Sequence, residues 1–226
     1  MKLIYFIIFS IIIFSNNLVL YAYNEEDVNY FLQNSKCHQC DLSNYNFENK
    51  YLDQAIISES ILTGANFNNV KMANSRILSS DFTNATFVHA DMNTTLIEDS
   101  NFTNTDLTEI NLVSSTIINS IFIKANLDLA KMYGVKAEQT KFDDATITNA
   151  NIQKSILSTS SFIKTNFTGS LLSLSLMDNV NLSYANMSKV KARGVNFTDS
   201  NLEFANLSYS AFRRSVFNNS NMNNIK

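Results

Sequence analysis

Residues 64–93 read GANFNNVKMANSRILSSDFTNATFVHADMN, and this stretch decides the fold. A large apolar residue stands at every fifth position, beginning with Phe67 and ending with Met92. Two residues before each of them stands a small side chain, as Ala65 stands before Phe67. The other three positions of each five are mostly Asn, Asp, Ser, Thr or Lys. The stretch therefore repeats a unit with one large apolar residue, one small residue and three mostly polar positions.

The same unit runs through nearly the whole chain without a frame slip. From Leu42 to Met222 there are 37 positions at this spacing, and 35 of them hold Leu, Ile, Met or Phe. The exceptions are Ala137 and Ala192. A period of five turns successive apolar residues by about 140° around an α-helix, and it also conflicts with the two-residue alternation of a strand. We therefore predict a chain that turns a corner every five residues and points one large side chain inward on each side.

A second period of twenty residues is superimposed on the first. One series of apolar positions is dominated by Phe and Leu: Leu42, Leu62, Phe82, Phe102, Phe122, Phe142, Phe162, Leu182, Leu202 and Met222. The small partners in this series are mostly Ser, whereas those in the next series are mostly Ala. Positions twenty apart resemble each other more than positions five apart. This indicates four sides per coil, with like residues stacked between coils.

The motifs GANFNNV (64–70), ATFVHADMN (85–93) and YANMSKV (184–190) resemble the A(D/N)LXX repeat of the pentapeptide-repeat proteins. The resemblance covers about residues 40–224. It implies an all-β fold, a right-handed quadrilateral parallel β-helix (a solenoid) of about nine coils with four repeats per coil. At roughly 4.8 Å between stacked strands, such a rod is on the order of 45 Å long. Its interior is expected to be filled by side chains, with no pore and no deep pocket.

The first segment, residues 1–22, reads MKLIYFIIFSIIIFSNNLVLYA and resembles a secretory signal peptide, with cleavage expected after Ala22. The alternative is an uncleaved N-terminal anchor, because Leu3 to Tyr23 is long enough to span a bilayer. Asn16 and Asn17 in the middle of that span make an anchor costly. In both cases we expect the rest of the protein to be exported, to the periplasm or as a secreted protein.

Residues 23–39 are expected to form an N-terminal cap and residues 40–226 the β-helix. The open ends of a solenoid expose unpaired strand edges and need covering. Asn24 is a candidate N-cap for a short helix that has Val28 and Phe31 on its apolar face. No helix is predicted after the last coil. That end is expected either to fray or to form an end-to-end homodimer, as some members of the family do.

Two cysteines enclose the segment Cys37-His38-Gln39-Cys40, which leads into the first coil much as a CxxCDL segment does in many family members. A zinc site would need a fourth ligand, and the other histidine, His89, is over two coils away. A thioredoxin-type redox pair would need a βαβ context, which the sequence lacks. A structural pair that closes into a disulfide in an oxidising compartment is the favoured interpretation.

No catalytic, cofactor-binding or metal-binding residue is predicted. His38 and His89 are the only histidines, and the carboxylates are scattered over outward positions. Paired carboxylates on a convex rod lack the desolvated cleft that raises one pKa for acid–base catalysis. The four glycines form no phosphate-binding motif. The net charge of −3, or −4 after removal of the leader, argues against a nucleic-acid binder.

The outward positions beside the apolar centres differ between the sides of the predicted rod. The series that holds Phe47 has one apolar flank among eighteen, Val88. The series that holds Ile57 has seven among eighteen: Ile56, Leu78, Leu96, Ile118, Ile156, Leu176 and Val216. We expect this side to meet a protein partner or a second copy of the chain. The alternative is that flanking positions are only loosely constrained.

The predicted function is a non-enzymatic, exported scaffold or protein-interaction module. One alternative, implied by the family resemblance, is a DNA mimic that binds a type II topoisomerase. That role would need a cytoplasmic location and a dense acidic surface. Another alternative is an exported polysaccharide-acting β-helix enzyme, a class that uses irregular coils with clefts. No cofactor and no nucleic-acid partner are expected, and membrane contact is expected only if the leader is uncleaved.

Overall fold

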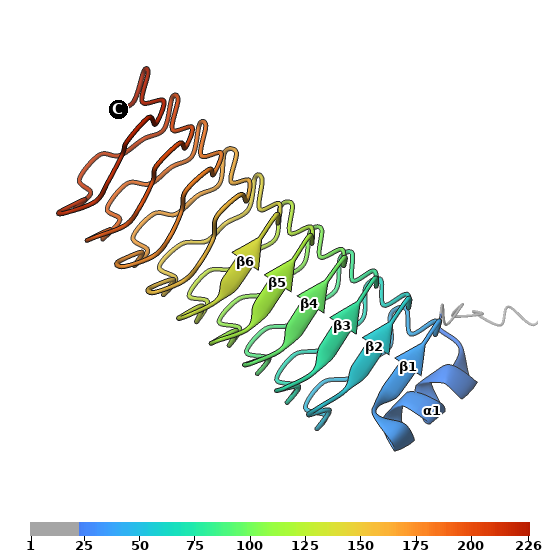
Figure 1. The fold of residues 1–226 in the computed structure, drawn as a ribbon. Coiled ribbons are helices and arrows are strands. Elements are labelled where there is room, and N and C mark those ends of the chain that lie inside the picture. The colour runs from blue at the N-terminus through green and yellow to red at the C-terminus, as the bar shows by residue number, and fades with distance from the viewer. Residues whose placement is uncertain (1–22) are drawn as a thin grey trace, which may run out of the picture.

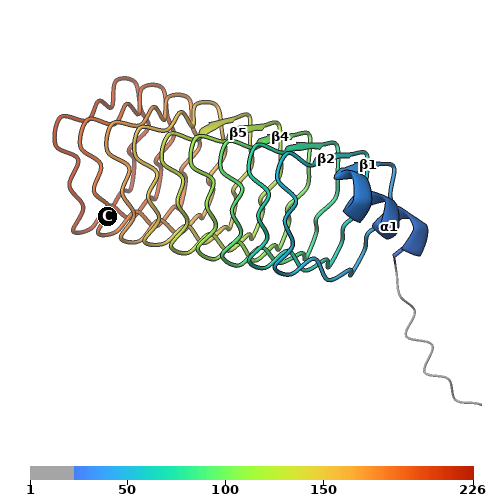
Figure 2. The ribbon, with the colours of Figure 1, turned by 90° about the horizontal axis from the view of Figure 1, so that it is seen from below.

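The computed structural model describes residues 23–226, an elongated rod with a helix at its N-terminal end (Figure 1). The predicted signal peptide, residues 1–22, lies outside the described residues. Helix α1 is followed by six strands of three residues: α1 Glu25–Asn34, β1 Lys36–His38, β2 Ile56–Ser58, β3 Arg76–Leu78, β4 Leu96–Glu98, β5 Thr116–Ile118 and β6 Lys136–Glu138. Seen after a quarter turn, the chain winds in stacked coils along the rod (Figure 2).

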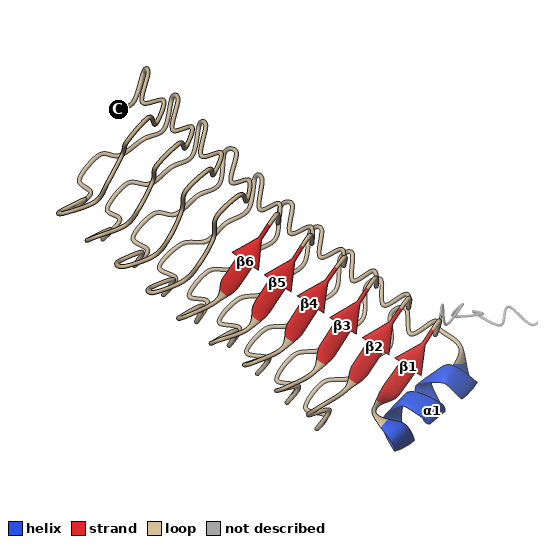
Figure 3. Ribbon diagram, in the orientation of Figure 1, coloured by secondary structure: helices blue, strands red, loops and turns tan. Residues whose placement is uncertain are grey.

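All strand pairing is parallel and joins residues twenty apart. Strands β1 to β6 form one sheet in chain order, beginning with Lys36 opposite Ile56. Beyond β6 the same step continues as single bridges, as far as Asn201 opposite Asn221; Figure 3 draws that part of the chain as loop. The parallel β-solenoid is therefore confirmed. Its continuous sheet accounts for about five turns, fewer than the nine or so coils expected, and bridges extend the coil beyond it.

The sheet ends at β6 because the hydrogen bonding changes at one corner. Upstream, the amide of Asn119 donates to the carbonyl of Glu138 on the next coil, at 3.1 Å. The amide of Gln139 donates instead to the hydroxyl of Thr159, at 3.3 Å. The amides of Ser160, Ser200 and Ser220 at this corner close tight turns within their own coils, whereas the amide of Val180 donates to the hydroxyl of Ser200. The later coils are thus joined to their neighbours by single bridges on all four sides.

The four faces are numbered here by the central residues of one coil: Phe82 on the first face, Phe87 on the second, Met92 on the third and Ile97 on the fourth. Each of these side chains is buried. At every fifth position from 39 to 224 a residue adopts a left-handed backbone conformation, with φ between 48° and 77°. Asn and Gly tolerate this conformation better than other residues, which explains the Asn-rich outward positions of the repeat.

Like residues stack on one another inside the rod. On the first face the Phe82 and Phe102 rings lie 4.7 Å apart and nearly parallel, and Phe102 and Phe122 lie 4.8 Å apart. The column continues through Phe142 and Phe162 at 5.1 Å per step. This spacing is close to the distance between neighbouring strands, so flat rings fill the interior without gaps. The twenty-residue period of the sequence reflects this stacking.

The small residues at the corner between the fourth and first faces are mostly Ser for a specific reason. The amide of Ser60 donates to the hydroxyl oxygen of Ser80 at 3.1 Å, and the amide of Ser80 donates to Ser100 in the same way. Each hydroxyl in turn donates to a carbonyl, as Ser80 does to Leu78 at 2.8 Å. At the next corner the amide of Ala65 closes a tight turn within its own coil, so no hydroxyl is needed there.

Helix α1 covers the N-terminal end of the rod, as expected. The Asn24 side chain accepts hydrogen bonds from the first-turn amides, and Phe31 is fully buried against Phe47, with ring centroids 5.6 Å apart. The Asp27 carboxylate accepts the amide of Asp41 at 2.8 Å, so the helix also satisfies a polar group on the edge of the first coil. Among the described residues, no helix combines the length and hydrophobicity needed to cross a bilayer.

The boundary between cap and solenoid lies earlier than residue 40. Strand β1 already pairs with β2, and Cys37 occupies an inward central position opposite Ile57. The expected cap of residues 23–39 therefore includes one side of a coil, because the five-residue spacing extends one unit before Leu42. At the other end, the central residues Phe212 and Phe217 are only partly buried. Within residues 23–226 no further element covers this last coil, and an end-to-end homodimer there stays a prediction.

Replacing Ser80 with Ala is expected to destabilise the rod by about 1–3 kcal/mol, because the buried amide of Ser60 loses its acceptor. The matched control is Ser79→Ala at the neighbouring exposed corner position, expected to change stability by less than about 0.5 kcal/mol. Denaturant unfolding measures both. Equal unfolding midpoints for the two variants would show that the hydrogen bonds from these amides to the serine hydroxyls contribute nothing to stability.

Replacing Phe31 with Ala is expected to loosen the cap and speed amide hydrogen exchange in the first coil. The contacts of a solenoid are between neighbouring coils, so exchange in the C-terminal coils should stay unchanged. Tyr30→Ala, on the exposed side of the same helix, is the control and should leave exchange as it is. Uniform exchange along the rod in the Phe31 variant would contradict the assignment of α1 as a local cap.

Candidate functional site

The fourth face is the side on which β1–β6 lie (Figure 1). In each strand the central residue points inward and its two neighbours point outward. In the consecutive strands β2 to β5, one outward position per strand is apolar, and it alternates between the first and the third residue. We call these four residues the apolar seam: Ile56, Leu78, Leu96 and Ile118.

Charged residues of opposite sign lie on the two sides of the apolar seam. In the sheet register Arg76 stands between Ile56 and Leu96, and Glu98 stands between Leu78 and Ile118. Ile56 is 36% exposed and the other three seam residues are half-buried. The seam is therefore a zigzag of partly exposed aliphatic side chains with a basic and an acidic neighbour.

The other three residues of the predicted partner surface lie on the same face but are separated from the seam. Strand β6 interrupts it, because Lys136 and Glu138 occupy both outward positions and form an ion pair at 3.5 Å. Ile156 and Leu176 are bridge partners on the following coils. Val216 stands apart from them, because Asn196 lies between it and Leu176 in the register. The seven residues thus form one seam, one pair and one single residue.

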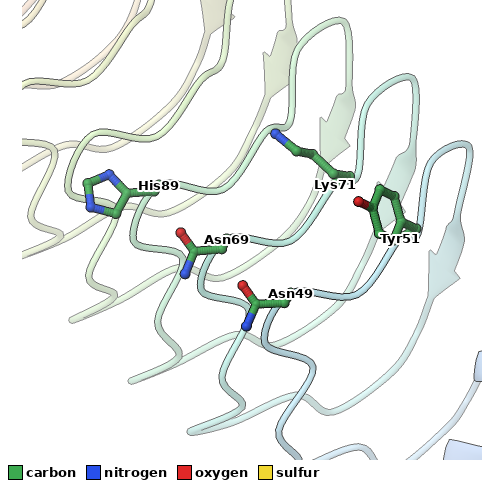
Figure 4. A pocket seen from close by; sticks show the side chains of 5 residues that line it. All are labelled: Asn49, Tyr51, Asn69, Lys71 and His89. Carbon is green, nitrogen blue, oxygen red and sulfur yellow. The ribbon is translucent and has the colours of Figure 1, made fainter.

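A shallow hollow of about 420 Å³ lies at the corner between the second and third faces (Figure 4). Asn49, Asn69 and His89 line it from one corner position on three successive coils, and Tyr51 and Lys71 line it from the third face. The lining is polar and Tyr51 is 82% exposed. An open hollow of this kind leaves a bound molecule in contact with water.

His89 occupies an outward corner and forms one ion pair, with Glu109. Its Nδ1 lies 3.3 Å from a carboxylate oxygen of Glu109, and about half of each side chain is exposed. Exposed ion pairs of this kind are screened by water and contribute little. Within residues 23–226, no hydroxyl or thiol is hydrogen-bonded to the His89 ring. Among the described residues, the pair therefore has neither a nucleophile hydrogen-bonded to it nor an enclosed cleft around it.

Cys37 and Cys40 are joined by a disulfide in the structure. Both are buried, Cys37 at the centre of β1 and Cys40 at the small position of the next corner. His38 points outward, and its Nδ1 lies 3.0 Å from the hydroxyl of Ser58. In the described part of the chain, no group of three or more His, Cys, Asp or Glu side chains is placed to hold a metal ion.

Charge is distributed unevenly along the rod, a feature that the overall net charge conceals. Residues 23–144 carry 17 acidic and 8 basic side chains, whereas residues 145–226 carry 3 acidic and 8 basic. The N-terminal part is therefore strongly acidic and the C-terminal part basic. A count by halves would have revealed this from the sequence, but the faces on which the charges lie become visible only in the coil.

A solved structure shares this fold, that of a fluoroquinolone resistance protein. A trypsin-treated variant of QnrB1, a plasmid-mediated fluoroquinolone resistance protein, has a TM-score of 0.57 at 12% identity over 80% of this chain and 92% of that chain. HetL, a pentapeptide repeat protein involved in heterocyst differentiation regulation from the cyanobacterium Nostoc sp., is 14% identical over 90% of this chain and 94% of its own, with a TM-score of 0.39. At 12% identity the likeness to QnrB1 concerns the fold alone.

No curated protein matches the sequence. The family described as Pentapeptide repeats matches in eight copies, over residues 35–74, 60–99, 97–134, 160–199 and 196–226. These matches begin one residue before β1, leave residues 135–159 unmatched and extend to the C-terminal end of the rod. With the five-residue unit, the twenty-residue register and these matches together, the chain belongs to the pentapeptide-repeat family.

Proposed function

We propose that the chain is an exported, non-enzymatic protein-interaction module, and that the apolar seam on its fourth face binds a protein partner. Pentapeptide-repeat proteins are in general structural or interaction modules rather than enzymes. The observation that carries the proposal is the run of four apolar outward residues on four consecutive strands. Such a run places aliphatic side chains at the centre of a flat sheet face.

The surroundings of the seam have the composition of a protein-binding surface. Protein interfaces combine an apolar centre with a polar rim that fixes orientation and specificity. Here Arg76 and Glu98 lie beside the aliphatic residues, on opposite sides of the seam. A partner with an apolar ridge between an acidic and a basic side chain would complement this arrangement.

The size of the seam favours a different protein over a second copy of the chain. Four coils at roughly 4.8 Å each give a seam on the order of 15–20 Å long. Stable dimers bury at least about 1,000 Å² with good complementarity. Four partly exposed side chains are too few to hold two rigid rods together. A segment of a different protein could contact the apolar seam and also reach Arg76 and Glu98, and it would then bury more surface than the seam alone provides.

The disulfide and the leader both support export. Disulfides persist mainly in oxidising compartments outside the cytoplasm, and Cys37 and Cys40 are paired in the structure. Residues 1–22 have the composition of a signal peptide. The DNA-mimic alternative is disfavoured by charge, because a mimic of DNA needs acidic side chains along its length and residues 145–226 have a net charge of +5.

The double variant Leu96→Lys/Ile118→Lys is expected to lose the partner, because two ammonium groups would be buried against an apolar surface. The control is Ile121→Lys/Ile123→Lys, which makes the same chemical change at half-buried outward positions of the first face. Affinity capture from the producing cells, with the tagged wild type as bait, measures binding. We expect proteins captured by the wild type and the control but not by the seam variant.

Identical captured proteins for all three baits would overturn the assignment of the seam. Export is tested separately, by cell fractionation and N-terminal sequencing of the purified protein. The proposal predicts an exported product that begins at Tyr23. A cytoplasmic product that retains residues 1–22 would contradict export and would revive the DNA-mimic alternative.

A further inference from the structure

The C-terminal end of the third face carries a concentrated basic surface. Lys191, Arg193 and Arg213 are outward residues on two successive coils of this face. Lys189 and Arg214 stand at the two corners that border it, both in the left-handed conformation. All five side chains are exposed. We call these five residues the basic end patch.

The basic end patch lies on a part of the rod without neutralising carboxylates. The ion pairs found within residues 23–226 are Lys71–Asp91, His89–Glu109 and Lys136–Glu138, all in earlier coils. Residues 145–226 contain only three acidic side chains. Their positions in the repeat place them away from the third face: Asp178 on the fourth face, Asp199 at the corner between the fourth and first faces, and Glu203 on the first face. The positive charge is therefore available to an external anion.

Exposed apolar side chains border the patch at both corners. Tyr209 follows Lys189 at one corner and is 92% exposed. Leu174 precedes Gly194 at the other corner and is 58% exposed. Basic residues mixed with exposed tyrosine and leucine are typical of surfaces that rest on the headgroup layer of a membrane. A surface that binds only a polyanion has no need of the two apolar side chains.

A hollow beside the patch is of a size to admit a headgroup. It has a volume of about 550 Å³ and is lined by Arg193, Arg214, Leu174, Gly194, Ser173 and Gln153. Gly194 adds no side chain at the corner between Leu174 and Arg214, which keeps the hollow open. The two guanidinium groups are donors suited to a phosphate group. The Ser173 hydroxyl is not a free donor, because it donates to the carbonyl of Lys191 at 3.3 Å. Leu174 supplies an apolar contact at the rim.

We propose that the basic end patch docks the end of the rod on a membrane surface that contains anionic phospholipids. The patch covers two coils, roughly 10 Å along the rod, which is short for a track along duplex nucleic acid. The patch is a broad surface near the end of the rod with apolar edges, and this shape suits contact with the headgroup layer of a membrane. This contact needs no membrane-spanning segment, so it differs from the contact expected from an uncleaved leader.

Vesicle co-sedimentation of the full chain tests the proposal. We expect binding to phosphatidylcholine vesicles that contain 30% phosphatidylglycerol, weak binding to pure phosphatidylcholine, and loss of binding as salt rises. Each basic residue near an anionic surface strengthens binding about fivefold. The triple variant Lys191→Gln/Arg193→Gln/Arg213→Gln should therefore bind on the order of a hundredfold more weakly. Circular dichroism should show an unchanged fold, because all three side chains are exposed.

The matched control is Lys131→Gln/Lys136→Gln/Lys141→Gln, which changes the net charge equally at three outward positions of an earlier coil. The affinity of this control for anionic vesicles should stay within about threefold of the wild-type affinity. The variant Leu174→Ser/Tyr209→Ser should weaken binding to anionic vesicles and leave the salt dependence unchanged, because it removes the apolar edges and no charge.

Three outcomes would overturn the proposal. One is equal binding of the wild type and the triple Gln variant to anionic vesicles. Another is tighter binding of a short DNA duplex or heparin than of vesicles, unaffected by Leu174→Ser/Tyr209→Ser, which would make the patch a polyanion site. The third is self-association at low salt that the triple Gln variant abolishes, without vesicle binding by the wild type, which would make the partner a second copy.

Discussion

The twenty-residue backbone register is the constraint on which the rest of the structure depends. The amide of Phe102 donates to the carbonyl of Ile121 at 2.6 Å, and the amide of Phe122 donates to Lys141 at 2.7 Å. The flanking amides bond in the other direction, as Asn101 does to Ser80 at 2.9 Å. Each coil is thus bonded to both neighbours along its length. A coil of another length would leave buried amides without acceptors. Each unpaired amide would cost more free energy than one backbone hydrogen bond contributes to stability.

The register also determines which positions of the chain are available for binding other molecules. It stacks flat Phe rings at 4.7 to 5.1 Å inside the first face, and it aligns serine hydroxyls with amides at one corner. With the interior filled and its polar groups satisfied, the outward positions are what remains for recognition. The apolar seam and the basic end patch are two different uses of these positions. One relies on aliphatic contact at the middle of the sheet, and the other on charge near the open end of the rod.

The interior could be predicted from the sequence, whereas the surface could be predicted only in part. The inward central positions hold large apolar side chains almost throughout, so the spacing of five is easy to recognise. Asn24 is equally clear as a helix N-cap. The disulfide of Cys37 is predicted from the sequence, but its central inward position is not, because Cys37 is not a large apolar residue although it lies one unit before Leu42. A count of flanks found the fourth face but not the alternation of Ile56 with Leu78, because only the pairing register distinguishes the two outward positions.

Disulfide trapping measures the register most directly. Thr86 and Asp106 are bridge partners twenty residues apart, so cysteines at these positions should cross-link on mild oxidation, as the distance between neighbouring strands allows. The matched pair Thr86→Cys/Asn111→Cys, twenty-five residues apart, places the second cysteine on the next face and should stay reduced. Peptide mass spectrometry distinguishes the two. Cross-linking of the twenty-five-residue pair, or none in the twenty-residue pair, would contradict the four-sided coil.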